Sequence, residues 1–135
     1  MDNRIVGIWK LVDSSARGPD GGAMPRPYGP EGMGLVTFKP NGRMMAVLND
    51  ARAVVPDGGV REYVSYSGTY TFDGQTLTTR VDGSSIARIA LGGDQVRGVK
   101  FDGADRMTLT PPPLAVAGVD VQRELVWERV SATPA

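Results

Sequence analysis

The sequence lacks cysteine and histidine, and each absence excludes a class of chemistry. Without cysteine the chain can form no disulfide and offers no thiolate. Without histidine it has no imidazole general base, no Ser-His-Asp triad and no histidine-based metal site. The Asp-Gly pairs lack the carboxylate spacing of a calcium loop, and the sequence has no fingerprint of a redox cofactor. We therefore expect neither a metal nor a cofactor.

Net charge and long apolar runs are also absent. Lysine plus arginine and aspartate plus glutamate number 15 each, so no net field favours nucleic acid or an anionic membrane. No apolar run approaches about 20 residues, and residues 1–12 do not resemble a secretion signal. The sequence thus predicts a soluble, cytoplasmic protein with no nucleic-acid or membrane partner.

The segment from Tyr63 to Asp82 organises what is present. Val64, Tyr66, Gly68, Tyr70 and Phe72 alternate with serines and threonines, which is typical of a strand with one buried face. Asp73-Gly74 divides the segment, and Asp-Gly between two such runs is a strong hairpin signal. This segment predicts a hairpin whose apolar face points toward a core.

Similar patterns predict six further strands. They cover residues 5–15, 33–39, 43–49, 95–101, 106–110 and 122–130. Asn41-Gly42 and residues 102–105 are turn sequences. Residues 86–91 could form a short helical turn, and we expect 131–135 to be a frayed tail. We therefore predict a single all-β domain over residues 1–135. It would be an eight-stranded antiparallel up-and-down barrel with little helix, because closure removes both sheet edges.

Five short motifs follow one another along the chain. In order they are Gly7-Ile8-Trp9-Lys10-Leu11, Asn41-Gly42-Arg43, Tyr66-Ser67-Gly68-Thr69-Tyr70, Gln95-Val96-Arg97 and Trp127-Glu128-Arg129. Together they resemble the bacterial lipocalin-like domain family. The resemblance implies a barrel whose floor is closed by Trp9, with Arg129 stacked on it. The family often has histidines after the Y-x-G-x-Y hairpin, where this chain has Thr79 and Arg80, so a proton-transfer role is not carried over.

Alternation along each strand selects the candidate site residues. If Trp9 and Leu11 face the interior, Asp13 follows them toward the mouth. The residues expected to bind a ligand are Tyr28, Met45, Tyr66, Tyr70, Gln95, Arg97 and Phe101. In an enzyme, Asp13 would be the base, Tyr66 the proton donor and Arg97 the group that stabilises negative charge.

Several of these residues have a second interpretation. Arg97 could pair with Asp13 or Glu124 inside the barrel, or with an anionic ligand. Tyr28 lies near the end of a loop over residues 17–30 that is either a lid over one mouth or a mobile connector. Residues 43–49 are apolar on both faces, so Met45 could line a ligand surface, pack in the core or contribute to a homodimer contact.

Two functions fit these patterns. The first is a module that binds a small hydrophobic or amphipathic metabolite in the lumen, with Arg97 orienting its polar end. The second is a cofactor-free isomerase, cyclase, hydratase or lyase acting on a small hydrophobic substrate of polyketide, terpenoid or aromatic type, in the same lumen. Resemblance to other barrels of this kind suggests the second function. A structural domain with a solidly packed lumen is the third possibility.

Overall fold

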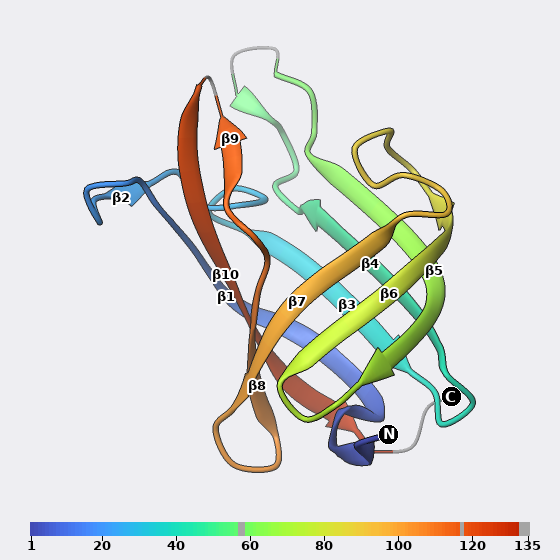
Figure 1. The fold of residues 1–135 in the computed structure, drawn as a ribbon. Helices are drawn as coiled ribbons and strands as arrows, with labels where there is room; N and C mark the ends of the chain where they lie inside the picture. Colours follow the sequence, from blue (N-terminus) through green and yellow to red (C-terminus); the bar gives the residue numbers. More distant parts are fainter. Residues whose placement is uncertain (57–58, 117, 133–135) are drawn as a thin grey trace.

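Eight long strands form a closed ring in the structure, a computed structural model that describes residues 1–56, 59–116 and 118–132. In ring order they are β1 (Gly7–Arg17), β3 (Gly32–Phe38), β4 (Arg43–Asp50), β5 (Tyr63–Phe72), β6 (Thr76–Ser84), β7 (Asp94–Phe101), β8 (Arg106–Thr110) and β10 (Val119–Ser131). Each strand pairs antiparallel with the next, and β10 pairs back with β1 (Figure 1). The predicted eight-stranded up-and-down barrel with almost no helix is confirmed for the described residues.

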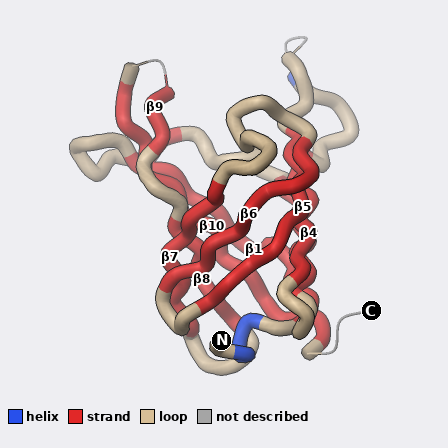
Figure 2. The backbone as a smooth tube through the Cα atoms, turned by 45° about the vertical axis from the view of Figure 1, so that its right-hand side comes forward, coloured by secondary structure: helices blue, strands red, loops and turns tan. Residues whose placement is uncertain are grey.

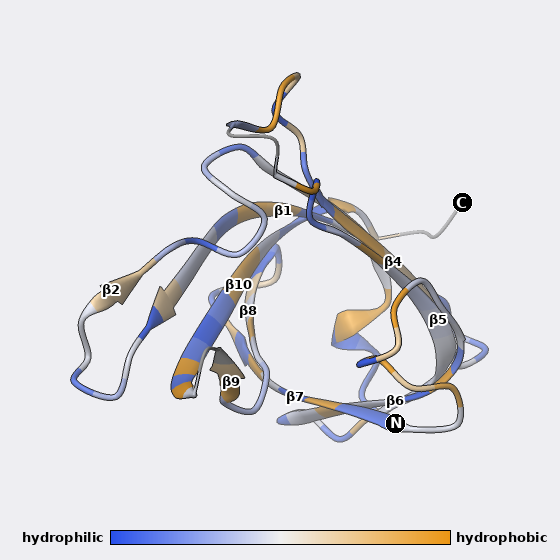
Figure 3. Cartoon of the chain, turned by 90° about the horizontal axis from the view of Figure 1, so that it is seen from above, coloured by the Kyte–Doolittle hydropathy of each residue, from blue (hydrophilic) through white to orange (hydrophobic). Residues whose placement is uncertain are grey.

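Two short strands extend the wall where β1 and β10 project beyond the ring. β2 (Ala23–Met24) pairs with the end of β1, and β9 (Leu114–Val116) pairs with the start of β10. Both lie at the open end of the barrel, which we call the mouth (Figures 1 and 3). The last strand therefore begins at Val119, three residues before its predicted start at Gln122. Ser131 ends β10, and residues 133–135 of the expected tail lie outside the described residues.

The tight turns lie where the sequence predicted them. Gly42 and Gly74 have φ angles of 86° and 101°, which only glycine adopts without strain. The Asp73 carboxylate also accepts hydrogen bonds from the backbone N–H groups of Gln75 and Thr76. These contacts fix the central hairpin at the end opposite the mouth.

The segment at 86–91 is an irregular loop and not the expected helical turn. Val81 pairs with Gly92 and Gly93 through backbone hydrogen bonds, which draws the segment back onto the end of β6. The N–H of Ile89 bonds to the carbonyl of Ile86 in a single turn. This loop buries Ile89 and carries Arg88 over the mouth.

η1 (Asn3–Ile5), a short 3-10 helix that Figure 2 shows beside the N-terminus, lies at the floor of the barrel, opposite the mouth. The indole Nε1 of Trp9 donates to the carbonyl of Ile5 over 2.9 Å, and both residues are fully buried. The guanidinium of Arg129 lies 4.2 Å from the Trp9 ring centroid and donates to the carbonyls of Val6 and Arg4. The predicted stacking of Arg129 on Trp9 is confirmed.

Candidate functional site

A cavity occupies the upper half of the lumen, between the packed floor and the mouth. Its free volume is about 40 Å³, and about 640 Å³ when the space open to solvent is included. Aliphatic side chains form much of its wall, among them Val36, Ala46, Leu48, Val64, Leu77 and Leu109. The polar groups of the lining are Tyr28, Tyr66, Arg88, Arg97, Arg123 and the indole of Trp127. The cavity therefore combines an apolar body with a cationic entrance.

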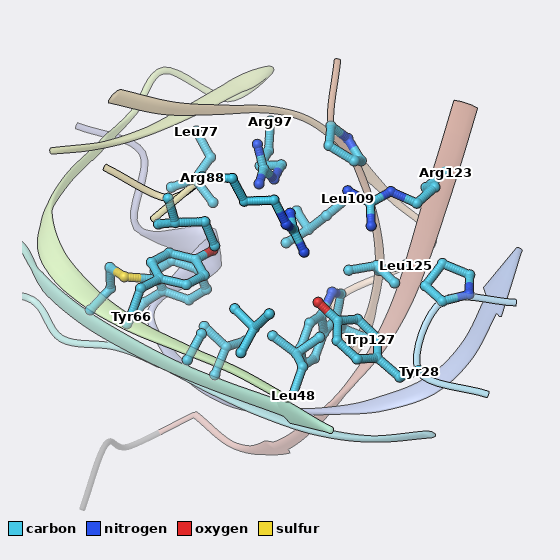
Figure 4. A pocket seen from close by; sticks show the side chains of 18 residues that line it. Tyr28, Leu48, Tyr66, Leu77, Arg88, Arg97, Leu109, Arg123, Leu125 and Trp127 are labelled. Carbon is cyan, nitrogen blue, oxygen red and sulfur yellow. The ribbon is translucent and has the colours of Figure 1, made fainter. Parts of the chain in front are cut away.

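Three arginines from separate elements converge at this entrance, and we call them the arginine cluster. Arg88 comes from the loop after β6, Arg97 from β7 and Arg123 from β10. Figure 4 shows them gathered along one side of the cavity, with Leu48 and Trp127 across from them. No ion pair within the described part of the chain involves any of the three. Among the described residues that line the cavity, none is acidic.

Burial and mutual repulsion both act on these guanidinium groups. Burial lowers the pKa of Arg97, the tyrosines Tyr66 and Tyr28 counter this in part, and the positive charge of Arg88 lowers it further. Burial likewise lowers the pKa of Arg123, and the charges of Arg88 and Arg97 add to the effect. Both groups remain cations at neutral pH, because arginine is not deprotonated in proteins. The structure thus holds like charges together in a partly dehydrated place.

The hydrogen bonds of the cluster leave part of its capacity unused. Arg97 donates to Gln95 Oε1 over 2.7 Å and to the carbonyl of Val96. Arg123 Nε and Trp127 Nε1 are buried donors that have no hydrogen-bond partner among the described residues. A buried donor without an acceptor costs about 1–3 kcal/mol. An acceptor on a bound molecule would offset that cost.

Tyr28 enters the cavity from a strained backbone position. Its φ angle of 63° lies in the left-handed region, which a bulky residue rarely adopts. Its N–H donates to Glu62 Oε2 over 2.9 Å, so the loop before β5 holds it there. Burial raises the pKa of the phenol, an effect that the charge of Arg123 reduces. The structure thus places Tyr28 at the mouth, where one of the two interpretations of its loop put it.

Tyr66 is the second phenol of the cavity. Burial raises the pKa of its hydroxyl, and the positive charge of Arg97 lowers it in part. Both tyrosines are therefore neutral hydrogen-bond donors at neutral pH. The structure brings Tyr28, Tyr66 and Arg97 together; strand alternation predicted the inward face for Tyr66 and Arg97, whereas Tyr28 comes from the loop before β3. Gln95 lies beside them in an adjoining outer groove and contacts the cluster through Arg97.

Tyr70 and Phe101 also face inward, but they belong to the packed floor and not to the cavity. The hydroxyl of Tyr70 donates to the carbonyl of Lys39, and its ring lies edge-on to Phe38 at 5.1 Å. Phe101 packs against Phe72 and Trp9, with centroid distances of 5.9 and 6.4 Å. Alternation predicted the correct face for both residues. Their height along the barrel places them below the ligand-accessible space.

Asp13 faces solvent, so the prediction that it points into the lumen is wrong. A register shift between Leu11 and Asp13 leaves Val12 without a partner on β10, and this bulge reverses the alternation of β1. Ser14 and Ala16 are buried instead. The Asp13 side chain is 57% exposed and pairs with Arg26 at 3.2 Å. Glu124 is exposed as well, so neither expected carboxylate partner reaches Arg97.

Met45 lies on the outer wall, which corrects the prediction that it lines the ligand surface. It is 62% exposed, whereas its neighbours Met44 and Ala46 are buried. The pleat of β4 gives the inner face to the even-numbered residues from Met44 to Leu48. A homodimer contact through the outer face of β4 stays a prediction.

Sequence analysis missed Arg88, Arg123 and Trp127 as site residues. Arg123, Leu125 and Trp127 alternate along β10 and line the same cavity, so the period of a strand could have identified Arg123. Arg88 gives no comparable signal, because its orientation depends on the pairing of Val81 with Gly92 and Gly93. Trp127 was recognised only as part of a motif.

No group of three or more acidic side chains that could hold a metal ion occurs among the described residues. Of the helices within the described ranges, none is long and apolar enough to cross a membrane.

Comparisons with known proteins give one family-model match, over the first part of the chain. No curated protein matches the sequence. Two solved structures are similar over most of the chain. A redesigned β-barrel has 12% identity and a TM-score of 0.46, covering 93% of this chain and 91% of that one. An uncharacterized protein from Bacteroides eggerthii DSM 20697 has 15% identity and a TM-score of 0.46, with 92% and 98% covered. The model of the lipocalin-like domain family matches residues 6–57, so the resemblance to that family is confirmed for this part of the chain.

Proposed function

We propose that this protein binds a small amphipathic molecule whose apolar body lies in the lumen and whose anionic end meets the arginine cluster. A lipocalin-like barrel fits ligand binding in general. The observation that carries the proposal is the convergence of Arg88, Arg97 and Arg123 on a cavity whose described lining has no carboxylate. Guanidinium groups pair bidentately with carboxylate and phosphate, so this arrangement suits an anion.

Electrostatics supports an anionic end over a neutral one. An unpaired charge that leaves water costs several kcal/mol in an apolar surrounding, and neighbouring like charges add to that cost. Within the described residues the cluster donates to neutral acceptors such as Gln95, and the one carboxylate that acts on it, Glu62 on Arg123, forms no ion pair with it. A bound anion would replace the lost hydration and reduce the repulsion among the three cations.

The volume of the cavity bears on how a ligand would enter. A free volume of about 40 Å³ holds only a few water molecules, by the measure of about 10–15 Å³ each. A longer apolar chain therefore requires side chains at the mouth to move aside. Arg88 suits this role, because it is exposed and lies on a loop outside the strand ladder.

The enzyme alternative has weaker support. Tyr66 and Arg97 lie together in the cavity, where a phenol could donate a proton and a guanidinium could stabilise negative charge. Asp13, the proposed base, lies outside the barrel wall and pairs with Arg26. Carboxylate-based isomerase, cyclase or lyase chemistry would therefore need a base that the substrate itself supplies.

Binding of three probes with the same tail tests the proposal. Octanoate, octanol and octylammonium share an apolar chain and differ in the charge of their head. In isothermal titration calorimetry the affinity should decrease from octanoate through octanol to octylammonium. Turnover of octanoate is not expected, and mass spectrometry of the incubated solution checks this.

Matched variants separate the cluster from general charge effects. Arg97→Gln removes a cation of the cavity, and Arg106→Gln removes one that pairs with Glu128 on the outer wall. We expect Arg97→Gln to weaken octanoate binding about tenfold, which is about 1.4 kcal/mol, and Arg106→Gln to leave it unchanged. Equal affinities for the three probes would contradict the proposal.

A further inference from the structure

The arginine cluster faces two spaces at once. Arg88, Arg97 and Arg123 line the lumen cavity, and the same three side chains line a groove outside it. Residues 94–97 and 111–114 form the other walls of this groove, which has a free volume of about 250 Å³. The cluster therefore stands at the boundary between a largely apolar interior and a groove that is open to solvent. A head group held there keeps part of its hydration.

The positive charge at this boundary is not balanced by the chain. Within the described lining of both spaces the only acidic residue is Asp94, and its carboxylate already bonds to Arg80 Nε over 2.6 Å. Glu62 lines neither space and forms no ion pair with Arg123, although its negative charge favours the cation, and its carboxylate accepts the N–H of Tyr28. Three cations thus face the head group together, and a single negative charge would leave two of them unmatched.

We infer that the head group is a dianion with three peripheral oxygens, a phosphate monoester of an apolar alcohol, an inference that rests on the proposed function. A monoester carries about −1.5 to −2 charges at neutral pH and has three strong acceptor oxygens, so each guanidinium of the cluster can meet one of them. A carboxylate offers one charge and two oxygens. The buried Nε of Arg123, which has no acceptor among the described residues, supplies a further donor.

Matched probes test the charge of the head group. Octyl phosphate, octyl sulfate, octanoate and octanol have the same tail, and their affinities are measured by calorimetry at about pH 8. We expect octyl phosphate to bind at least about tenfold more tightly than octyl sulfate or octanoate. Octyl sulfate is the critical comparison, because it has the same three peripheral oxygens with only one charge.

A second measurement at about pH 5 uses the titration of the probe itself. The second pKa of a phosphate monoester is about 6, so only about a tenth of it is dianionic at pH 5. The affinity for octyl phosphate should therefore fall about tenfold between pH 8 and pH 5. Octyl sulfate is a monoanion at both pH values, so any change in its affinity between them would come from the protein.

Substitution of Arg88 links this preference to the cluster. Arg88 is exposed, so Arg88→Gln should fold normally, and we expect it to reduce the preference for octyl phosphate over octyl sulfate several-fold. The outer-wall variant Arg106→Gln should retain the preference.

The outcomes distinguish this inference from the proposed function. One outcome is that octyl sulfate and octanoate bind as tightly as octyl phosphate, with all three binding better than octanol. In that case the inference of a dianionic head group is wrong, and the proposed binding of an amphipathic anion stands. If octanol binds as tightly as the anions, both are overturned. A preference for phosphate that is lost in Arg88→Gln supports both.

Discussion

Arg129 connects three parts of the chain at the barrel floor. Its guanidinium donates to the carbonyls of Arg4, Val6 and Ala104 and covers the face of Trp9. Lysine keeps the charge but cannot reproduce this planar set of donors. We therefore expect Arg129→Lys to lower the free energy of unfolding by about 2 kcal/mol in urea denaturation, through lost hydrogen bonds and stacking.

The matched control for Arg129 is Arg106→Lys, whose parent side chain is half exposed and pairs with Glu128. Its effect should stay within about 0.5 kcal/mol. Octanoate binding should survive in both variants, since the floor does not line the cavity. If Arg129→Lys lost as little stability as Arg106→Lys, the positive charge alone would be sufficient at position 129.

Asp50 links the pH of the solution to the stability of the mouth. Its carboxylate is buried, and hydrogen bonds from the side chain and backbone of Arg52 lower its pKa from the usual 3.8. A lowered carboxyl pKa contributes stability that is present above about pH 4 and is lost as the pH falls through the folded-state value. Asp50→Asn should be less stable than the parent at pH 7, and the difference should shrink below pH 4.

Thermal unfolding between pH 7 and pH 2 measures this difference. Asp13→Asn is the control, because its parent carboxylate is exposed and pairs with an exposed arginine. Exposed pairs contribute about 0–1 kcal/mol, so this variant should follow the parent curve closely. It should also bind octanoate normally. If the difference in melting temperature between Asp50→Asn and the parent stayed constant across the pH range, ionisation of Asp50 would be ruled out as its cause.

At the scale of one element, the bulge in β1 predicts unequal tolerance to deletion. Val12 has no partner on β10, so its removal leaves Leu11 facing inward, Asp13 outward and Ser14 inward on a regular strand. We expect deletion of Val12 to lower the free energy of unfolding by about 1 kcal/mol and to preserve octanoate binding.

Deletion of Val47 is the contrasting change, because β4 pairs without a bulge on both sides. Removing one residue there turns Leu48 and Asp50 to the opposite face, and the chain should fail to fold. Circular dichroism and urea denaturation compare the two variants. Equal damage from both deletions would show that the bulge is as necessary as the regular ladder.

The elements also show what the sequence could predict. On β7 the alternation is unbroken, so Arg97 and Phe101 were assigned to the correct face; Gln95 shares that face but lies in the outer groove and not in the cavity. On β1 one unpaired residue reverses the alternation, and nothing local in the sequence marks Val12 as that residue. β2 and β9 form only because β1 and β10 project beyond the ring and leave edges to be paired. Arg88 depends on tertiary pairing of its loop. The fold follows from local periodicity, while much of the site follows from contacts between distant segments.

For the whole molecule, a functional cation cluster should reduce the stability of the free protein. Arg88 is exposed and repels both Arg97 and Arg123, so Arg88→Gln removes repulsion without creating a cavity. We expect the ligand-free variant to gain about 0.5 kcal/mol in unfolding free energy. Octanoate should raise its melting temperature less than it raises that of the parent.

Arg106→Gln produces the same change in net charge and is the control for this comparison. It loses an ion pair and should gain no stability. A loss of stability in Arg88→Gln would indicate that the cluster is internally compensated and not poised for an anion.

The position of the arginine cluster also affects the speed of encounter. The formal charges of the chain cancel, so at long range the molecule exerts little pull on an anion. At the mouth the three cations of the cluster lie together, and their field reaches about a Debye length, roughly 8 Å at physiological ionic strength. In the proposed binding mode, an approaching anion would be guided toward the open end of the barrel with its charged head leading. The apolar tail would then have to reorient before it enters the lumen, and this rotation, together with the displacement of Arg88, would be part of the time that loading takes.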